Sequence, residues 1–170
     1  MRTRGMKASF RATGQTGILI AGEGVSIDAV VADFISGAVE VLSPDNDPEH
    51  WDVIEGQGSL FHPSFAGVSL GLLHGAQPDA LVMCHEPTRT HMRGLPDYAL
   101  PSLEECIVAN EAAARLTNRS ATCIGVSINT ANLTQADAEE VLRETEARIN
   151  LPCVDAVRTG VGPLVARIMD

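Results

Sequence analysis

Lysine is almost absent from this 170-residue sequence, in which Lys7 is the only one. Lys7 precedes a predicted strand and lies in no glycine-rich loop. A phosphate-binding P-loop needs the pattern Gly-x-x-x-x-Gly-Lys-[Ser/Thr], whose lysine reaches the β- and γ-phosphates of a nucleotide. No such motif is present. If the chain handles a nucleotide, it does so without that lysine, or the lysine stood on a segment that this sequence lacks.

Basic residues in general are scarce, because 12 Lys and Arg stand against 22 Asp and Glu, a formal net charge of -10. Nucleic-acid backbones reward clustered Lys and Arg, so we expect no nucleic-acid partner. No apolar run reaches the roughly 18 residues of a membrane-spanning helix. Residues 1–7 lack the apolar segment of a secretory signal. We therefore expect no membrane partner and a cytoplasmic location.

Closely spaced cysteine pairs and a serine elbow are missing as well. The sequence has no Gly-x-Ser-x-Gly pattern, which disfavours a serine hydrolase. It has no Cys-x-x-Cys, and a zinc site needs closer ligand pairs, so we predict no metal site. Of the four cysteines, three lie inside apolar runs (Cys84, Cys123 and Cys153) and Cys106 is the fourth. This pattern favours small buried thiols in a reducing compartment.

The sequence does contain short apolar runs that alternate with amphipathic segments. We predict strands at 7–13, 52–55, 80–84, 122–128 and 154–157, and helices at 26–42, 66–74, 102–116, 134–149 and from Pro163 onward. Ser26 is a predicted N-cap, and Ser102 with Glu105 and Thr134 with Asp137 match capping signatures. Residues 85–101 are predicted to be a long loop. The pattern is typical of one α/β domain spanning 1–170, a three-layer, mainly parallel sheet with helices on both faces.

Polar clusters follow four of the predicted strands, after Thr13, Ile54, Cys84 and Ile128. Ligands of such sheets bind beyond the carboxyl ends of the strands. We therefore expect the clusters to form one site. In particular, we expect the acid Glu55 and the cationic stretch beginning at His85 to share a single cleft.

The first two clusters are rich in glycine. Backbone N–H groups after the first strand can face an anion, with a simple tight turn as the alternative. Glu55 can hold a metal ion, accept a proton or orient an ammonium group, and its alternative is to cap a nearby helix. The candidate binding residues here are Gly14, Gln15, Thr16, Gly17, Gly56, Gln57, Gly58 and Ser59.

Histidines and arginines supply the remaining candidates. His62 lies between aromatic residues, which indicates a partly desolvated imidazole that is either a general base or a packed structural residue. Two histidines and two arginines within a short stretch of an acidic chain favour an anion or carboxylate site, unless they form a solvated loop. These four are His85, Arg89, His91 and Arg93. Asn129 contacts a ligand or caps a turn, and Arg158 is either a ligand contact or structural.

Four of these segments resemble one bacterial family long catalogued only as a domain of unknown function, the DgcN-type D-glutamate N-acetyltransferases. They are Arg11 to Ile20, Trp51 to Leu60, Cys84-His85-Glu86-Pro87 and Ser127-Ile128-Asn129-Thr130. The resemblance covers nearly the whole chain. It implies a P-loop NTPase-like fold related to dethiobiotin synthetase. Because family members carry a Rossmann-like domain, a strand, a phosphate loop and a helix before the matching region, the resemblance implies that this chain lacks its fold's first strand, phosphate loop and first helix.

The resemblance also implies acetyl transfer from acetyl-CoA to the amine of D-glutamate, within D-amino acid metabolism. Under that hypothesis Glu55 or His62 is the catalytic base, and the cations from His85 to Arg93 bind substrate carboxylates. The glycine-rich segments and Asn129 bind the cofactor. One alternative is an ATP- and Mg²⁺-dependent ligase or kinase-like enzyme, in which Glu55 helps to hold Mg²⁺. Another is a non-catalytic, self-associating module. Under every one of these hypotheses we expect a homo-oligomer.

Overall fold

The computed structural model describes residues 1–169, and the chain divides into two compact units. The first unit comprises residues 1–78 and 113–119. The second comprises residues 79–112 and the chain from 120 onward. Parallel strands and flanking helices occur in both units, which agrees with the predicted α/β class. None of the helices described in residues 1–169 is long and apolar enough to cross a bilayer.

The first unit is built on a parallel pair of strands, β1 (Lys7–Arg11) and β2 (His50–Ile54), with Arg11 opposite Ile54. Its helices are α1 (Gln15–Ala21), α2 (Ile35–Leu42) and α3 (Ala66–Ala76), together with the 3-10 turns η1 (Arg2–Arg4), η2 (Ile27–Ala29) and η3 (Ala32–Phe34). The buried core of this unit consists of Ile27, Ile35, Val39 and Leu72.

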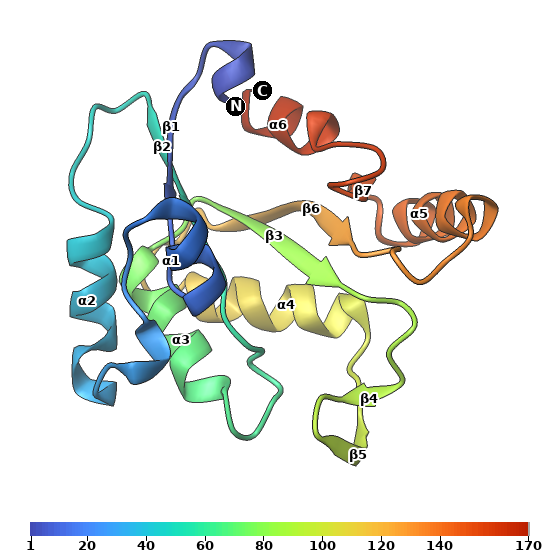
Figure 1. Cartoon of the computed structure of the whole chain (residues 1–170), viewed down its shortest axis with the longest axis horizontal. Helices are drawn as coiled ribbons and strands as arrows, with labels where there is room; N and C mark the ends of the chain where they lie inside the picture. Colours follow the sequence, from blue (N-terminus) through green and yellow to red (C-terminus); the bar gives the residue numbers. More distant parts are fainter. Residues whose placement is uncertain (170) are drawn as a thin grey trace. The chain divides into compact units, whose positions relative to one another are not determined.

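Helices α2 and α3 run side by side in this unit, as Figure 1 shows, and glycines allow the contact. A Cβ atom on Gly75 would lie 2.7 Å from the carbonyl oxygen of Ser36, and one on Gly71 would lie 2.7 Å from Cγ2 of Ile35. Real side chains essentially never approach so closely. The face of α3 that packs on α2 therefore requires glycine.

The second unit contains a three-stranded parallel sheet in the order β3 (Ala80–His85), β6 (Thr122–Ile128), β7 (Cys153–Val154). The central strand β6 is buried along most of its length, as expected for a parallel strand covered on both faces. Helices α4 (Leu103–Ala114), α5 (Gln135–Ile149) and α6 (Gly162–Met169) complete the order of elements. The core here consists of Leu103, Val126, Ile128, Leu142 and Cys153.

The predicted capping box at Ser102 and the predicted cap at Thr134 are both confirmed. Ser102 Oγ accepts a hydrogen bond from the backbone N of Glu105, whose carboxylate accepts one from the backbone N of Ser102. The side chain of Thr134 accepts a hydrogen bond from the backbone N of Asp137. Each helix therefore begins at the residue after its predicted cap, because the capping bonds are local and satisfy N–H groups that have no partner within the helix.

The predicted helix over 26–42 is wrong in its first half, and α1 was not predicted. The backbone N of Val25 donates to the carbonyl oxygen of Ala12, and that of Ile27 donates to Thr13. These bonds hold the start of the segment against the end of β1, so that two 3-10 turns follow and regular helix begins only at Ile35. Ser26 makes no side-chain cap hydrogen bond.

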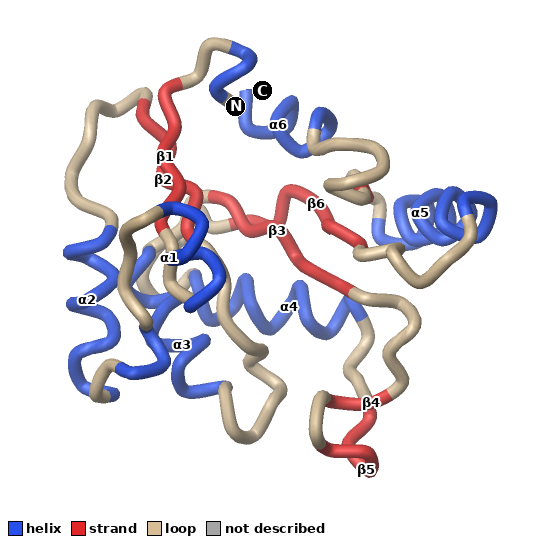
Figure 2. Tube along the Cα trace, in the orientation of Figure 1, coloured by secondary structure: helices blue, strands red, loops and turns tan. Residues whose placement is uncertain are grey.

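Three smaller corrections concern the remaining segments. The predicted loop 85–101 contains an antiparallel hairpin of β4 (His91–Met92) and β5 (Leu95–Ala99), which Figure 2 shows in red. The predicted outer strands 7–13 and 154–157 are shorter, ending at Arg11 and Val154. Cys123 and Cys153 are buried as predicted, whereas Cys84 is exposed, on the same face of β3 as the exposed Val82.

Candidate functional site

At the carboxyl end of the β1–β2 pair, Glu55 is bonded to the residues that follow β1. Its Oε2 accepts hydrogen bonds from the backbone N atoms of Thr13 and Gly14, both at 2.9 Å. Thr13 Oγ1 in turn donates to the carbonyl oxygen of Glu55 at 2.7 Å. The two predicted clusters of this unit therefore meet, as expected for the ends of parallel strands.

The glycines of this cluster allow close packing around the carboxylate. A Cβ atom on Gly17 would lie 2.1 Å from Oε2 of Glu55, and one on Gly14 would lie 2.6 Å from Nε2 of Gln57. Gln57 donates to Thr13 Oγ1 at 3.0 Å. The carboxylate thus sits at the N-terminal end of α1, where the helix dipole favours negative charge. This geometry matches the alternative in which Glu55 caps a helix.

The other predicted binding residues of this unit are placed around the same turn regions. Gln15 and Thr16 are exposed in the first turn of α1, and Gly56 and Gly58 are exposed after β2. Ser59 is half-buried, and its Oγ accepts a hydrogen bond from the backbone N of Phe61. Their assignment to cofactor binding stays a prediction.

His62 is buried, with 6% of its surface exposed. Its ring lies 4.3 Å from that of Phe65, centroid to centroid, and its Nδ1 accepts a hydrogen bond from the backbone N of Ser64 at 3.1 Å. The predicted desolvated environment is therefore confirmed. Because the Nδ1 lone pair is already engaged, the second alternative, a packed structural histidine, fits the contacts well.

The second unit contains a pocket of about 400 Å³ at the carboxyl ends of its parallel strands. Its walls come from the end of β3 and the segment after it, the end of β6, and the turn after β7. The lining residues are Cys84, His85, Glu86, Arg89, Ser127, Ile128, Asn129, Asp155, Ala156 and Val157. The structure thus brings together three predicted site residues, His85, Arg89 and Asn129.

Charged and polar contacts organise the wall after β3. Arg89 Nη2 donates to Glu86 Oε2 at 3.0 Å, and the hydroxyl of Thr88 donates to the other carboxylate oxygen. The backbone N of Asn129 donates to the carbonyl oxygen of His85 at 2.8 Å, which joins the ends of β3 and β6. Burial and then the nearby charge of Arg148 lower the pKa of His85, which favours its neutral imidazole.

Asp155 is a pocket residue that the sequence analysis missed. It is 4% exposed, and its Oδ1 accepts hydrogen bonds from the backbone N atoms of Val157 and Arg158 at 2.8 and 2.9 Å. Its Oδ2 accepts from Thr130. These donors hold its pKa well below the ordinary value, the hydroxyl of Thr130 contributing most. A sequence signal for Asp155 was available, because it directly follows the apolar residue Val154 just as Glu55 follows Ile54.

Three further candidates lie outside the pocket lining. His91 is half-buried in β4, and Arg93 is exposed in the turn of the hairpin. The guanidinium group of Arg158 donates to the carbonyl oxygens of Thr130 and Leu133, at 3.2 and 2.8 Å, and to Gln135 Oε1. The structural alternative for Arg158 is therefore the one that its contacts support.

The predicted cleft shared by Glu55 and His85 joins residues of different units, so it stays a prediction. Within residues 1–169, no group of three or more His, Cys, Asp and Glu side chains has the arrangement of a metal site.

Comparison with known proteins places these features in a family. Two curated relatives are named D-glutamate N-acetyltransferase: one from Tritonibacter scottomollicae is 58% identical over 97% of this chain and 50% of its own length. The other, from a Pseudoalteromonas species, is 55% identical over 99% of this chain and 51% of its own length. The chain therefore spans about half the length of the curated relatives it matches.

A solved structure and a family model agree with these relatives. The crystal structure of a DUF1611 family protein from Anabaena variabilis matches with a TM-score of 0.91 and 38% identity, over 99% of this chain and 50% of that protein. The DUF1611 model, described as a domain of unknown function (DUF1611_C) P-loop domain, matches residues 1–165. The chain belongs to the DUF1611 family and has the fold of its P-loop domain.

Proposed function

We propose that this chain is the P-loop-domain part of a D-glutamate N-acetyltransferase that takes its acetyl group from acetyl-CoA. The names of relatives at 55% and 58% identity support the substrate and the reaction class. The observation that carries the proposal is the pocket at the ends of β3, β6 and β7. It combines a guanidinium group, an amide and an imidazole in a volume of about 400 Å³.

The proposed reaction forms one C–N bond and breaks one C–S bond. The ammonium group of D-glutamate first loses a proton to a base, and the free amine attacks the thioester carbonyl carbon. Collapse of the tetrahedral intermediate releases the thiolate, which takes up the second amine proton. The products are N-acetyl-D-glutamate and coenzyme A, and no oxidant or metal enters the balance.

The chain offers groups for each of these tasks. Arg89 binds a substrate carboxylate, because its planar fork of N–H donors matches that group. Asn129 is exposed at the end of β6, where its Oδ1 accepts a hydrogen bond from the backbone N of Ala131 at 3.1 Å, as in the predicted turn-capping alternative. Its side-chain NH₂ group is the proposed donor to the ligand. The imidazole of His85 lines the pocket and is the proposed base there. The earlier candidates Glu55 and His62 lie in the first unit, and their role as the base stays a prediction. The segments at 14–17 and 56–59 belong to the first unit, and their role as donors to the thioester oxygen stays a prediction.

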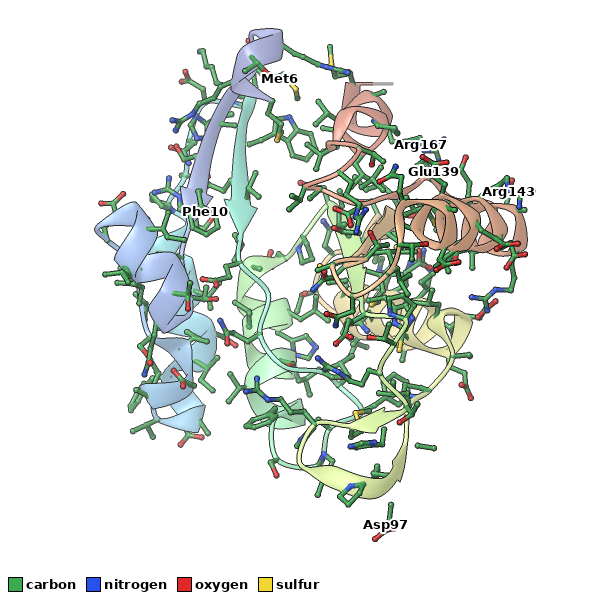
Figure 3. All side chains as sticks on the ribbon, turned by 45° about the vertical axis from the view of Figure 1, so that its right-hand side comes forward. Met6, Phe10, Asp97, Glu139, Arg143 and Arg167 are labelled. Carbon is green, nitrogen blue, oxygen red and sulfur yellow. The ribbon has the colours of Figure 1, made fainter. Side chains whose placement is uncertain are left out.

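Calorimetric titration of the purified chain with D-glutamate, acetyl-CoA and ATP in turn tests the binding part of the proposal. We expect D-glutamate and acetyl-CoA to bind, and Arg89→Ala to weaken D-glutamate binding about tenfold or more. Arg143→Ala is the matched control, because Arg143 is an exposed residue of α5 outside the pocket lining (Figure 3).

Mass-spectrometric detection of N-acetyl-D-glutamate tests the reaction itself, and it avoids thiol reagents that would also label the exposed Cys84. We expect product to form in proportion to the acetyl-CoA consumed. Binding and hydrolysis of ATP without consumption of acetyl-CoA would overturn the proposal in favour of the ligase alternative.

A further inference from the structure

Opposite charges lie side by side on one wall of the pocket in the second unit. Glu86 and Arg89 both line the pocket, and their side chains are joined by a hydrogen bond of 3.0 Å. Their side chains are 24% and 45% exposed, so both remain open to solvent. A ligand that enters the pocket therefore meets an anion and a cation together.

Both groups keep unused hydrogen-bonding capacity. A carboxylate has about four acceptor positions and a guanidinium group has five N–H donors. The carboxylate oxygens of Glu86 accept from Arg89 and from Thr88, and Asn132 contributes a further side-chain hydrogen bond. One N–H group of Arg89 is used in its bond to Glu86. A ligand can thus be bound without breaking the ion pair.

We propose that the Glu86–Arg89 pair recognises an amino acid as a zwitterion, with Glu86 binding the ammonium group and Arg89 binding a carboxylate. This inference rests on the proposed function, in which the amino acid is D-glutamate. The pair makes Glu86 a specificity-determining residue, because a carboxylic acid without an amine leaves Glu86 facing an anion.

The other ionisable groups around the pocket do not replace Glu86 in this role. The carboxylate of Asp155 already accepts hydrogen bonds from Thr130, Val157 and Arg158. The imidazole of His85 is either neutral or cationic, so in neither form does its charge attract an ammonium group. Glu86 is the other carboxylate among the lining residues. Its hydrogen bonds come from side chains of its own loop and of Asn132, so it is the lining carboxylate that can bind an ammonium group.

A consequence for turnover follows from the chemistry of the reaction. Acetylation converts the ammonium group into a neutral amide, so the product loses the charge that Glu86 binds. The same residue therefore binds the substrate more tightly than the product, and it favours release of the product once the acetyl group has been transferred.

Calorimetry on the purified chain with three ligands tests this inference. The ligands are D-glutamate, its product N-acetyl-D-glutamate, and glutarate, which has both carboxylates and no amine. In the unmodified chain we expect D-glutamate to bind most tightly. Glu86→Gln is expected to weaken D-glutamate binding about tenfold and to strengthen glutarate binding, because the anion that repels glutarate is gone.

Two further variants complete the design. Glu144→Gln removes a carboxylate from an exposed position of α5 outside the pocket lining, and we expect it to change no affinity. Arg89→Ala is expected to weaken the binding of all three ligands. Circular dichroism and urea midpoints establish that each variant is folded.

The outcomes separate this inference from the proposed function. Suppose that D-glutamate binds and is acetylated, but that Glu86→Gln changes the affinities for D-glutamate and glutarate in the same direction or changes neither. The zwitterion site is then overturned, and the proposed function stands. If D-glutamate does not bind, both are overturned. If Glu86→Gln changes the two affinities in opposite directions but no acetyl transfer is detected, the zwitterion site is supported and the proposed reaction is overturned.

Discussion

Asp155 accepts two hydrogen bonds from Thr130, one from the backbone N at 3.0 Å and one from the hydroxyl group. Thr130 follows β6 and Asp155 follows β7, and both residues are buried. The second carboxylate oxygen accepts two more hydrogen bonds, from the turn at Val157 and Arg158. A single charged side chain therefore joins two of the segments that form the pocket wall.

Substitution Asp155→Asn should destabilise the fold. The amide keeps the shape of the carboxylate, but it loses the charge and places an NH₂ group against N–H or O–H donors. Hydrogen bonds to charged groups contribute about 1.5–3 kcal/mol each, and an unsatisfied buried donor adds to the loss. We expect the free energy of unfolding, measured in urea, to fall by about 2–4 kcal/mol.

Asp97→Asn is the matched control for that measurement. Asp97 is exposed in β5 of the hairpin and is labelled in Figure 3. Exposed substitutions of this kind change stability by about 0.5 kcal/mol or less. A change of that small size in Asp155→Asn would show that its four hydrogen bonds contribute little.

The same carboxylate should make stability depend on acid pH. Its hydrogen-bond donors, foremost the hydroxyl of Thr130, hold the folded-state pKa of Asp155 well below the ordinary value of 3.8. The unfolded chain therefore takes up this proton first as the pH falls below about 4. The stabilisation is complete above that pH and is lost as the pH falls toward the folded-state pKa.

Urea midpoints measured from about pH 6 to about pH 3 check this dependence, because that range spans the unfolded-state pKa. We expect the midpoint of the unmodified chain to fall more steeply than that of Asp155→Asn, in which the titrating group is gone. Parallel curves of urea midpoint against pH for the two proteins would contradict the lowered folded-state pKa of Asp155.

Gly17→Ala should destabilise the first unit, because the new methyl group would overlap the Glu55 carboxylate, 2.1 Å from Oε2. The carboxylate can move away only by giving up its hydrogen bonds to the backbone N atoms of Thr13 and Gly14, so we expect a loss of about 1–3 kcal/mol. Gly67→Ala in α3 is the control, since nothing lies within 4 Å of its Cβ position. It should be neutral or stabilising by up to about 1 kcal/mol.

A double-substitution cycle identifies the cause of the loss. In Glu55→Ala the carboxylate is absent, so adding Gly17→Ala to it should cost much less than adding it to the unmodified chain. Equal costs in both backgrounds would mean that the methyl group clashes with something other than Glu55.

Thr134→Ala should lower the free energy of unfolding by about 1 kcal/mol, because the threonine side chain caps the first turn of α5. Ser26→Ala provides the contrast. Ser26 precedes a 3-10 turn and makes no cap hydrogen bond, so its loss should cost less than about 0.5 kcal/mol. Thermal or urea unfolding of the two variants side by side checks the difference.

The elements predicted well are those whose causes lie within a few residues of sequence. The helices after Ser102 and Thr134 start where their capping bonds are made, between residues three apart. Strand β6 matches its predicted range of 122–128, because a central parallel strand is mostly apolar along its length. The meeting of the residues after β1 with those after β2 also follows, from the parallel pairing of the two strands.

Other features depend on partners far away in the sequence. Residues 25–27 form hydrogen bonds with Ala12 and Thr13, and this pairing displaces the helix that their own periodicity predicts. Glu55 has the sequence context of a catalytic acid, yet its carboxylate is bonded to N–H groups 41 and 42 residues earlier. Sequence patterns record which residues are apolar, not which donors the fold brings to a carboxylate.

The sequence by itself determined the alternation of strands and helices, the local caps and the residue types available for chemistry. Tertiary structure alone decided which of those residues meet: it joined His85, Arg89 and Asn129 with the unpredicted Asp155 in one pocket. The physical reason is that local hydrogen bonds and hydrophobic periodicity act within a few residues. A pocket, by contrast, is formed where strand ends distant in the chain are paired side by side.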